Sequence, residues 1–498
     1  MYIAYDVKNG VEYAKLCTSK RDGAHTCKEY SNLGRVLDKA RGVYQNRERG
    51  IFAYNLETNT YSCAPAEFEP TGKAGRGKPL IVDFGDAFFL DSFIRSSGMV
   101  AAIDAIGYSN PDTLRAMLLY YILNPTSNRY ARDWWEGSYA RIIYPNASLS
   151  SQRISDFLAA IGDECSQREF FRVYFDLLDK SGNRTENILI DSTGLPNSIH
   201  FPLTAISNHN GEISNEVRLI YVVQQNSGLP IYFRYCPGNV IDATTLIRCL
   251  TELKEHGINT KFAILDAGYY MEANIQEFYA NKISFITRLK GNLTLYKELV
   301  AEHISSLESK ENLVEYNGRY VYLKCVECQL CGNSAYAYVG IDIERKSSEA
   351  RKTFQRAKDK KLTNDQVYDA MQKQGIFILI SSRRIALGKV LPLYYTRQQI
   401  EQIFDLGKNY AGLLPLRVHT EETFRGHLLV TFIATVVLKK IQDALKSTAI
   451  TPMSLFLNLR NQKCKVYEDK VITQEPFKKA NDCYKLFKIK CPTYIPNK

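Results

Sequence analysis

The 498-residue sequence lacks an apolar run long enough to span a membrane. Its longest run, at about residues 428–438, is roughly half of the ~20 residues that a membrane-spanning helix needs. A secretory signal is also lacking, because Asp6 and Lys8 interrupt the only early apolar stretch. Internal repeats and extended low-complexity segments are absent as well. These absences predict a folded, cytoplasmic protein with no membrane partner.

Cysteine is too sparse for a disulfide framework. The 12 cysteines are scattered, unlike those of a small secreted domain, so reduced thiols are expected. Only Cys325, Cys328 and Cys331 resemble part of a metal site. The residues around them alternate as in a β-strand, which puts Cys328 on the face opposite the other two. No His or fourth Cys lies close behind, so we expect structural or incidental thiols here.

Acidic residues are fewer than basic ones. The chain has 53 Asp and Glu against 64 Lys and Arg, a formal net charge of +11. This balance fits a polyanionic partner, nucleic acid first and an anionic membrane surface second. From Lys439 to Lys498, 13 basic residues oppose 5 acidic ones, which predicts a basic tail at 441–498. Such a tail could bind DNA phosphates without reading sequence, although a merely solvated surface fits equally well.

The N-terminal part of the chain divides into two regions. Residues 1–82 mix short alternating apolar segments with basic turns, which predicts a small α/β or β-rich module. Residues 83–180 are typical of helices. Pro111 begins one amphipathic segment, and Ser150 precedes another that Gly162 ends. A helix-turn-helix DNA reader and a plain helical bundle both fit this region.

Residues 181–291 and 376–440 alternate strand and helix patterns. Three strand patterns come first, followed by an amphipathic helix at 243–257 and two further strands. This order predicts a ribonuclease H-like fold, a mixed sheet flanked by helices. Its first three strands would form an antiparallel meander, and the fourth would join after a crossover. Residues 292–375 interrupt the pattern with tyrosine-rich strand signals and are predicted to be a β-rich insertion.

Two aspartates follow apolar strand patterns in the predicted core. Asp191 comes after ILI and Asp266 comes after FAIL, each before a glycine-containing turn. A carboxylate at such a strand end is held rigidly and still reaches solvent. Taken singly, each Asp is more typical of a turn former or a helix cap.

The segment YYTRQQIEQIFDLGK carries four polar side chains at helical spacing: Tyr394, Arg397, Glu401 and Lys408. If the segment is one helix at about 100° per residue, all four fall within an arc of roughly 60°. Ile400, Ile403, Phe404 and Leu406 take the remaining arc, so the helix can pack on a core while presenting the polar stripe. An ordinary solvated face with an Arg397/Glu401 pair is the simpler alternative.

Asp191, Asp266 and Glu401 together suggest a metal site. Phosphodiester cleavage needs an activated nucleophile and a stabilised leaving oxygen, and two divalent cations supply both. Carboxylate oxygens suit Mg²⁺ or Mn²⁺. The predicted insertion accounts for the long gap between the second aspartate and Glu401. Asp405, one helical turn after Glu401, is a rival third acid on spacing alone.

These motifs resemble those of the DDE transposases of bacterial insertion sequences, specifically the group with a Tyr-Arg-Glu-Lys signature. The resemblance rests on DSTG at Asp191, DAGYY at Asp266 and the four-residue signature in YYTRQQIEQIFDLGK. It covers roughly residues 185–440 and extends to Arg425, Gly426 and His427, which fit the family's pattern. The signature is specific, and the two Asp motifs are supportive.

The resemblance implies a role for each signature residue. Asp191, Asp266 and Glu401 would bind two metal ions, Mg²⁺ or Mn²⁺, and carry the catalysis. Tyr394, Arg397 and Lys408 would contact phosphates at the transposon end. The reaction would be hydrolysis of the 3′ strand, often through a hairpin, followed by strand transfer into target DNA. The implied partner is double-stranded DNA, bound by at least a dimer in a nucleoid-associated complex, with residues 83–180 at the DNA ends.

The chain departs from the family's pattern at two places. Many members have Arg after the second Asp, where this chain has Ala267. Members that form hairpins can use a Trp from the insertion to hold a flipped base. The two tryptophans of this chain, Trp134 and Trp135, lie before the core. A tyrosine could stack instead, the candidates being Tyr316, Tyr320 and Tyr336.

Two other functions fit the same residues. A stand-alone nuclease or Holliday-junction resolvase with a ribonuclease H-like core would cut DNA without strand transfer. A non-catalytic DNA-binding protein descended from a transposase is the second alternative, although the presence of all three acids argues against it. Inverted repeats flanking the coding region would favour the transposase.

Overall fold

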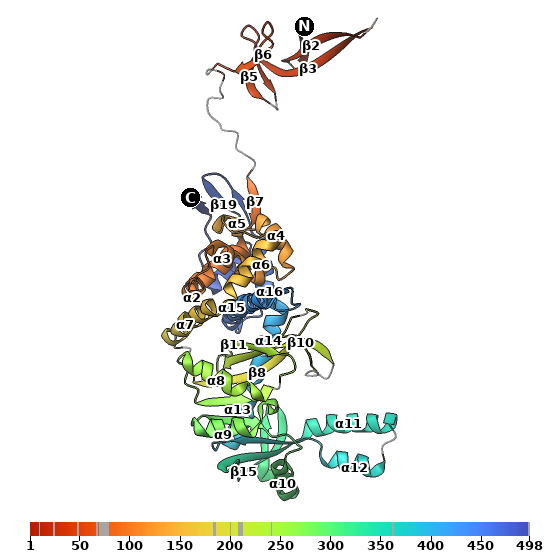
Figure 1. Cartoon of the computed structure of the whole chain (residues 1–498), viewed down its shortest axis with the longest axis vertical. Helices are drawn as coiled ribbons and strands as arrows, with labels where there is room; N and C mark the ends of the chain where they lie inside the picture. Colours follow the sequence, from red (N-terminus) through yellow and green to blue (C-terminus); the bar gives the residue numbers. More distant parts are fainter. Residues whose placement is uncertain are drawn as a thin grey trace. The chain divides into compact units, whose positions relative to one another are not determined.

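The computed structural model describes residues 1–8, 10–22, 25–46, 49–65, 68, 79–182, 186–199, 201–207, 213–240, 242–360 and 363–496 (Figure 1). The chain forms two compact units, Met1–Leu80 and Ile81–Lys498. The predicted helical region, the predicted core and the C-terminal residues all belong to the second unit.

The first unit is an antiparallel six-stranded meander in which each strand pairs with the next along the chain. The strands are β1 (Tyr2–Lys8), β2 (Val11–Asp22), β3 (His25–Asp38), β4 (Val43–Asn46), β5 (Gly50–Asn55) and β6 (Thr60–Cys63). Its small core contains Ala14, Leu16, Leu33, Tyr44, Phe52 and Tyr54. Alternation along β2 buries Ala14 and Leu16 on one face and exposes Tyr13 and Lys15 on the other.

Seven helices follow β7 (Leu80–Asp83) near the start of the second unit. They are α1 (Gly85–Ser96), α2 (Met99–Asp104), α3 (Pro111–Leu123), α4 (Ala131–Gly137), α5 (Ala140–Ile143), α6 (Ser151–Ile161) and α7 (Glu164–Lys180). Asn110 caps α3 by accepting a hydrogen bond from the Thr113 amide at 3.0 Å, with Pro111 as the first helical residue. Ser150 caps α6, and Gly162 ends it. The predicted helix bounds at Pro111, Ser150 and Gly162 are therefore confirmed.

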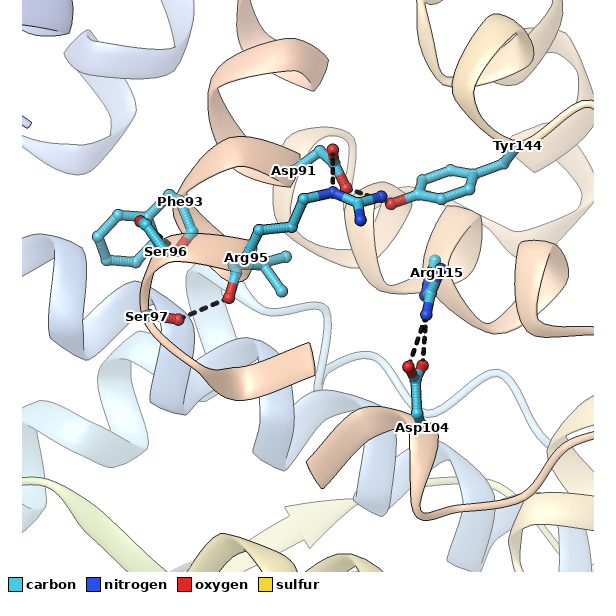
Figure 2. Close-up of polar contacts among 9 residues, drawn as sticks. Asp91, Phe93, Arg95, Ser96, Ser97, Asp104, Arg115 and Tyr144 are labelled. Carbon is cyan, nitrogen blue, oxygen red and sulfur yellow. Dashed lines mark hydrogen bonds and ion pairs between the residues drawn. The ribbon is translucent and has the colours of Figure 1, made fainter. Parts of the chain in front are cut away.

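Polar contacts link α1 to the loop after α5, and α2 to α3 (Figure 2). Asp91 on α1 accepts hydrogen bonds from Arg95 Nε at 2.8 Å and from the Tyr144 hydroxyl. Arg115 on α3 donates to both carboxylate oxygens of Asp104 on α2, at 2.6 and 2.7 Å. Burial and the charge of Asp91 raise the pKa of Tyr144, so its phenol stays protonated. These contacts join segments that are distant in the sequence.

A ten-stranded mixed sheet forms the centre of the second unit, in the order β11-β10-β8-β12-β13-β17-β16-β15-β14, with β9 paired to β10. Its first part comprises β8 (Asn187–Pro196), β9 (Ala205–Ser207), β10 (Ser214–Gln224), β11 (Pro230–Pro237), α8 (Leu246–Glu255), β12 (Phe262–Leu265), α9 (Glu272–Ala280) and β13 (Ser284–Arg288). Strands β8, β10 and β11 are an antiparallel meander, and β12 lies parallel to β8 after the α8 crossover. The predicted meander and crossover are confirmed.

The predicted insertion does not form a separate sheet. It contains α10 (Thr294–His303), β14 (Leu313–Tyr316), β15 (Arg319–Leu330), β16 (Asn333–Asp342), α11 (Ile343–Lys360) and α12 (Asn364–Gln372), and β17 (Ile376–Ser381) follows. Because β17 pairs with both β13 and β16, the inserted strands continue the central sheet. Short 3₁₀ turns lie at Asn128–Tyr130, Asp242–Thr244, Ala267–Tyr269, Ile304–Ser306 and Lys310–Asn312.

Three helices follow the sheet: α13 (Leu387–Tyr395), α14 (Gln398–Tyr410) and α15 (Glu421–Leu445). Residues 428–438, the longest apolar run, lie inside α15 and are all buried. Over the residues that the structure describes, we find no helix both long and apolar enough to cross a membrane. Helix α15 packs closely on α6, because a Cβ at Gly426 would lie 1.9 Å from the Leu158 carbonyl oxygen.

Residues 441–498 are folded rather than forming the basic tail that the sequence predicted. They contain α16 (Pro452–Arg460), β18 (Lys463–Val466), β19 (Lys470–Thr473), α17 (Lys478–Leu486) and β20 (Tyr494–Pro496), and three of these strands join β7 (Leu80–Asp83) in one sheet. Apolar side chains recur between the lysines, and Leu459 and Cys483 are fully buried. Arg460 also binds buried Asp86 at 2.7 Å. Net charge alone did not show this pattern.

Candidate active site

Asp191 and Asp266 lie on neighbouring parallel strands. Asp266 follows the last residue of β12, as predicted, but Asp191 lies within β8 rather than at its end. The strand continues because β10 pairs with it as far as Pro196. Ile190 pairs with Leu265, so the aspartates that follow them reach the same level of the sheet.

The segment that contains the signature is two helices and not the single helix that the sequence predicted. Tyr394 lies in α13, Arg397 lies at the junction, and Glu401 and Lys408 lie in α14. At the junction, backbone amides bond three residues back, from Arg397 to Tyr394 at 3.2 Å and from Ile400 to Arg397 at 3.0 Å. Such bonds tighten the backbone to about three residues per turn. The angles between the four signature side chains therefore differ from those that a single regular α-helix would give.

The apolar side of α14 packs on the sheet, as the periodicity predicted. Ile400, Ile403, Phe404 and Leu406 are all buried. The Phe404 ring stacks on Tyr221 of β10, with ring centroids 5.3 Å apart. Tyr221 is paired with Asp191, and facing residues of paired strands share one side of a sheet. Helix α14 therefore covers the side of the sheet that carries Asp191.

The guanidinium of Arg397 binds all three predicted acids. One of its terminal nitrogens lies 2.8 Å from Asp191 Oδ2 and 3.8 Å from Asp266 Oδ1, and the other lies 3.2 Å from Glu401 Oε1. The Asp191 side chain is 14% exposed, while those of Asp266 and Glu401 are 41% and 56% exposed. Three acids from two strands and a helix thus converge on one cation at the surface.

The charges of the acids change the properties of two neighbouring side chains. Burial alone lowers the pKa of Arg397, but the charges of Asp266 and Asp191 outweigh it and raise that pKa. Tyr394 is 5% exposed, and its burial and the charge of Asp266 raise the pKa of its phenol. Arg397 therefore stays charged, and Tyr394 stays a neutral hydrogen-bond donor.

Lys408 reaches β8 beside the acids. Its ammonium group donates a hydrogen bond to Thr193 Oγ1 at 2.6 Å. Thr193 lies two residues after Asp191, on the same side of the strand. Burial lowers the pKa of Lys408, and the charge of Glu216 partly opposes this effect. The contact between Lys408 and Thr193 was not predicted from the sequence. The period-two spacing of a strand does place Thr193 on the same face as Asp191.

Glu401 and the alternative third acid, Asp405, have different contacts. Glu401 contacts Arg397, whereas Asp405 is exposed and accepts a hydrogen bond from the Asn409 side chain at 2.5 Å. Ala267, where many members of the resembling family have Arg, begins a 3₁₀ turn directly after Asp266. It adds no cation to the site.

The chemistry of the three acids fits a divalent cation, because carboxylate oxygens are the ligands that Mg²⁺ and Mn²⁺ prefer. In this structure the three carboxylates are arranged around the guanidinium of Arg397. Within the described ranges, no three His, Cys, Asp or Glu side chains are grouped closely enough to share an ion. A cation that binds the three acids must therefore displace the Arg397 guanidinium or bear its repulsion.

An aromatic contact joins the inserted strands to α13. Tyr316, at the end of β14, stacks on Tyr395 with ring centroids 5.2 Å apart and an angle of 16° between the rings. The Arg319 guanidinium lies 5.5 Å from both rings. Tyr395 was not singled out from the sequence, and only its position beside Tyr394 pointed to it. Among the other tyrosines considered, Tyr320 is 53% exposed and Tyr336 is half-buried.

The residues after the signature stabilise the helices and do not contact the acids. Arg425 pairs with Glu421 one turn earlier on α15. The buried His427 ring contacts the Tyr121 hydroxyl at 2.9 Å and the Leu413 carbonyl oxygen at 3.2 Å. Burial lowers the pKa of His427 to about 4, so the ring is neutral. Trp134 and Trp135 lie in α4, within the helical region.

Comparison with known proteins matches the part of the chain that contains these residues to a described family. Residues 183–437, more than half of the chain, match the family described as Transposase DDE domain. One similar solved structure is a cryo-EM structure of the piggyBac transposase synaptic complex with hairpin DNA, which is 10% identical. That alignment covers 76% of this chain and 79% of the other, with a TM-score of 0.39. No curated protein sequence matches the chain.

Proposed function

Because this chain belongs to the transposases with a DDE domain, we propose that it mobilises an insertion sequence of the group with the Tyr-Arg-Glu-Lys signature. It would bind the terminal inverted repeats, cleave the 3′ strands and transfer them into target DNA. The convergence of Asp191, Asp266 and Glu401 on one guanidinium carries the proposal. A ribonuclease H-like core is part of it, supported by the β11-β10-β8-β12-β13 order.

The three acids are proposed to hold two Mg²⁺ or Mn²⁺ ions. When bound, these ions would activate the attacking hydroxyl and stabilise charge on the leaving oxygen. Asp191 and Asp266 provide rigid ligands, because Asp191 lies in a paired strand and Asp266 directly follows one. Glu401 comes from a helix and is the most exposed of the three. It has the most freedom to adjust when the acids close around an ion.

Tyr394, Arg397 and Lys408 are the proposed contacts to DNA phosphate. Once Arg397 leaves the acids, its planar fork of N–H donors suits a phosphate group. Lys408 supplies a second cation from the next turns of α14. Tyr394 is almost fully buried, so its hydroxyl meets DNA only if the site opens on binding. The net charge of +11 favours a polyanionic partner.

Two transposon ends must be held together for strand transfer, which implies at least a dimer of this chain on DNA. Tyr316 is the proposed base-stacking residue if a hairpin forms, because its ring stacks on Tyr395, which contacts the ring of Tyr394. Whether the element uses a hairpin is read from the size of the cleaved end under denaturing conditions.

The test uses the full chain and linear DNA that bears the element's own inverted repeats, with Mg²⁺ or Mn²⁺. Asp191→Asn, Asp266→Asn and Glu401→Gln are each expected to abolish cleavage. Asp405→Asn is the matched control, because it changes an acid on the same helix that Arg397 does not contact. Cleavage that survives all three substitutions would refute the proposed site, and loss with Asp405→Asn alone would move the third ligand to Asp405.

Joining of the cleaved 3′ ends to a target plasmid distinguishes transposition from simple nuclease activity. Recovered joints flanked by a short target duplication are the expected result. Efficient cleavage with no joined product, under conditions in which both ends are paired, would instead indicate a nuclease or resolvase.

A further inference from the structure

One face of the N-terminal meander carries exposed tyrosines and cations in an ordered arrangement. Paired residues share a face of a sheet, so the strand register identifies its members. Tyr13 lies between Asp6 and Arg35, Lys15 lies between Ala4 and Asn32, Cys17 lies between Tyr2 and Tyr30, and Ser19 faces Lys28. We call this surface the tyrosine face, defined by Tyr2, Tyr13, Lys15, Lys28, Tyr30 and Arg35. The opposite face holds the small core of the unit.

The three aromatic rings are unusually open to solvent. Tyr2, Tyr13 and Tyr30 are 48%, 38% and 62% exposed. None of them belongs to the core on the other side of the sheet, while Tyr2 and Tyr30 flank Cys17, which is 1% exposed. Tyrosines outside the core that project from long strands provide flat apolar surfaces for a ligand.

The charges of the tyrosine face are mainly positive and available. Lys15, Lys28 and Arg35 are exposed, and in the described part of the chain no ion pair engages them. The one acid in the same rows, Asp6, is within 4.0 Å of Lys8. The face therefore attracts a polyanion through cations that are paired with no acid among the described residues.

Aromatic and cationic rows alternate along β2 and β3, the long strands of the red part of Figure 1. Successive rows are two residues apart, which is roughly 7 Å on an antiparallel strand. Sheets that bind single-stranded nucleic acid stack bases on aromatic side chains and hold phosphates with neighbouring cations. Duplex DNA, whose bases are already stacked, does not use such rings.

We propose that the tyrosine face binds single-stranded DNA, with bases stacked on Tyr2, Tyr13 and Tyr30 and phosphates held by Lys15, Lys28 and Arg35. The proposal rests on the proposed function only for the choice of DNA as the nucleic acid. A strand released near a cleaved end is the kind of segment that this surface would hold.

The test measures binding of a short fluorescent oligothymidine and of a duplex of the same length by the full chain in EDTA, which prevents cleavage. Tyr13→Ala and Tyr30→Ala are each expected to weaken oligothymidine binding by about fivefold or more, as loss of one stacked base does. Tyr13→Phe and Tyr30→Phe keep the ring and should bind within about twofold of the parent. Lys15→Gln should reduce the salt dependence by about 0.7 in the log-log slope.

Tyr368→Ala is the matched control, because this tyrosine is 63% exposed and lies on α12 of the other unit. The proposal is overturned if the Tyr13→Ala and Tyr30→Ala proteins bind oligothymidine like the parent, or if duplex binding falls equally. Phe variants that fail as badly as the Ala variants would also overturn it, since the hydroxyl and not stacking would then matter. Because binding is measured in EDTA, it needs no metal ion at the three acids, so this result is separate from a failure of the proposed catalytic site.

Discussion

Arg397 should compete with divalent cations for the three acids. Its guanidinium lies 2.8, 3.8 and 3.2 Å from Asp191, Asp266 and Glu401, so a cation bound there must displace it or bear its repulsion. We therefore expect Arg397→Ala to bind Mn²⁺ more tightly than the parent when DNA is absent. Arg397→Lys keeps the positive charge and should bind Mn²⁺ nearly as weakly as the parent.

The size of the effect follows from Coulomb's law. A unit charge about 4 Å away contributes about 1 kcal/mol in bulk water and about 4 kcal/mol at an effective dielectric constant of about 20. Asp266 and Glu401 are 41% and 56% exposed, which places the site near the lower value. Because Mn²⁺ carries two charges, the lower value doubles, and removing the charge of Arg397 should change Mn²⁺ affinity by about thirtyfold, equivalent to about 2 kcal/mol.

Calorimetric titration of the DNA-free full chain with Mn²⁺ measures this affinity directly. Adding Asp191→Asn to Arg397→Ala should abolish the gain, which shows that the ion binds at these acids. Equal or weaker Mn²⁺ binding by Arg397→Ala would refute the competition, and a gain that survives Asp191→Asn would place the ion elsewhere. DNA cleavage by Arg397→Ala should still fall, because the same side chain is a proposed phosphate contact.

Two further predictions concern stability. The pKa of His427 is lowered from 6.5 to about 4, so between these pH values the unfolded chain binds a proton that the folded chain does not. The free energy of unfolding, which has its full value above the unfolded pKa, should therefore fall by about 2 kcal/mol at about pH 5. Urea unfolding of His427→Gln should lack this loss. Gly426→Ala places a methyl group 1.9 Å from the Leu158 carbonyl oxygen and should cost about 1–3 kcal/mol or more, measured by urea unfolding. Gly388→Ala, with nothing within 4 Å, is the control and should be neutral or slightly stabilising, so an equal loss there would contradict the packing argument.

Local sequence signals predicted the elements that depend on local chemistry. Asn110, Pro111 and Ser150 mark helix starts because capping satisfies backbone amides that have no partner within the helix. The apolar periodicity after Arg397 identified the buried side of α14 for a similar reason. These signals act over a few residues, so one sequence is enough to detect them.

Features that depend on distant pairing were not predictable in this way. Asp191 lies inside a strand because β10 continues to pair beyond it, and nothing in DSTG itself reveals that partner. The inserted strands join the central sheet through β17, which pairs on both sides. The break between α13 and α14 has no Gly or Pro at Thr396 or Arg397, so no helix-breaking residue marks it.

Arg397 fits both interpretations that the sequence allowed, an ordinary ion pair with Glu401 and a member of the signature site. Its spacing from Glu401 predicted an ordinary i, i+4 ion pair, and that pair exists at 3.2 Å. A purely local pair would leave the guanidinium in solvent, yet here it also reaches Asp191 and Asp266. That reach requires β8 and β12 to be parallel neighbours and α14 to cover them, which no local pattern specifies. The i, i+4 pair between Arg397 and Glu401 also fits a solvated helix face. In the fold, the same Arg397 side chain contacts all three acids.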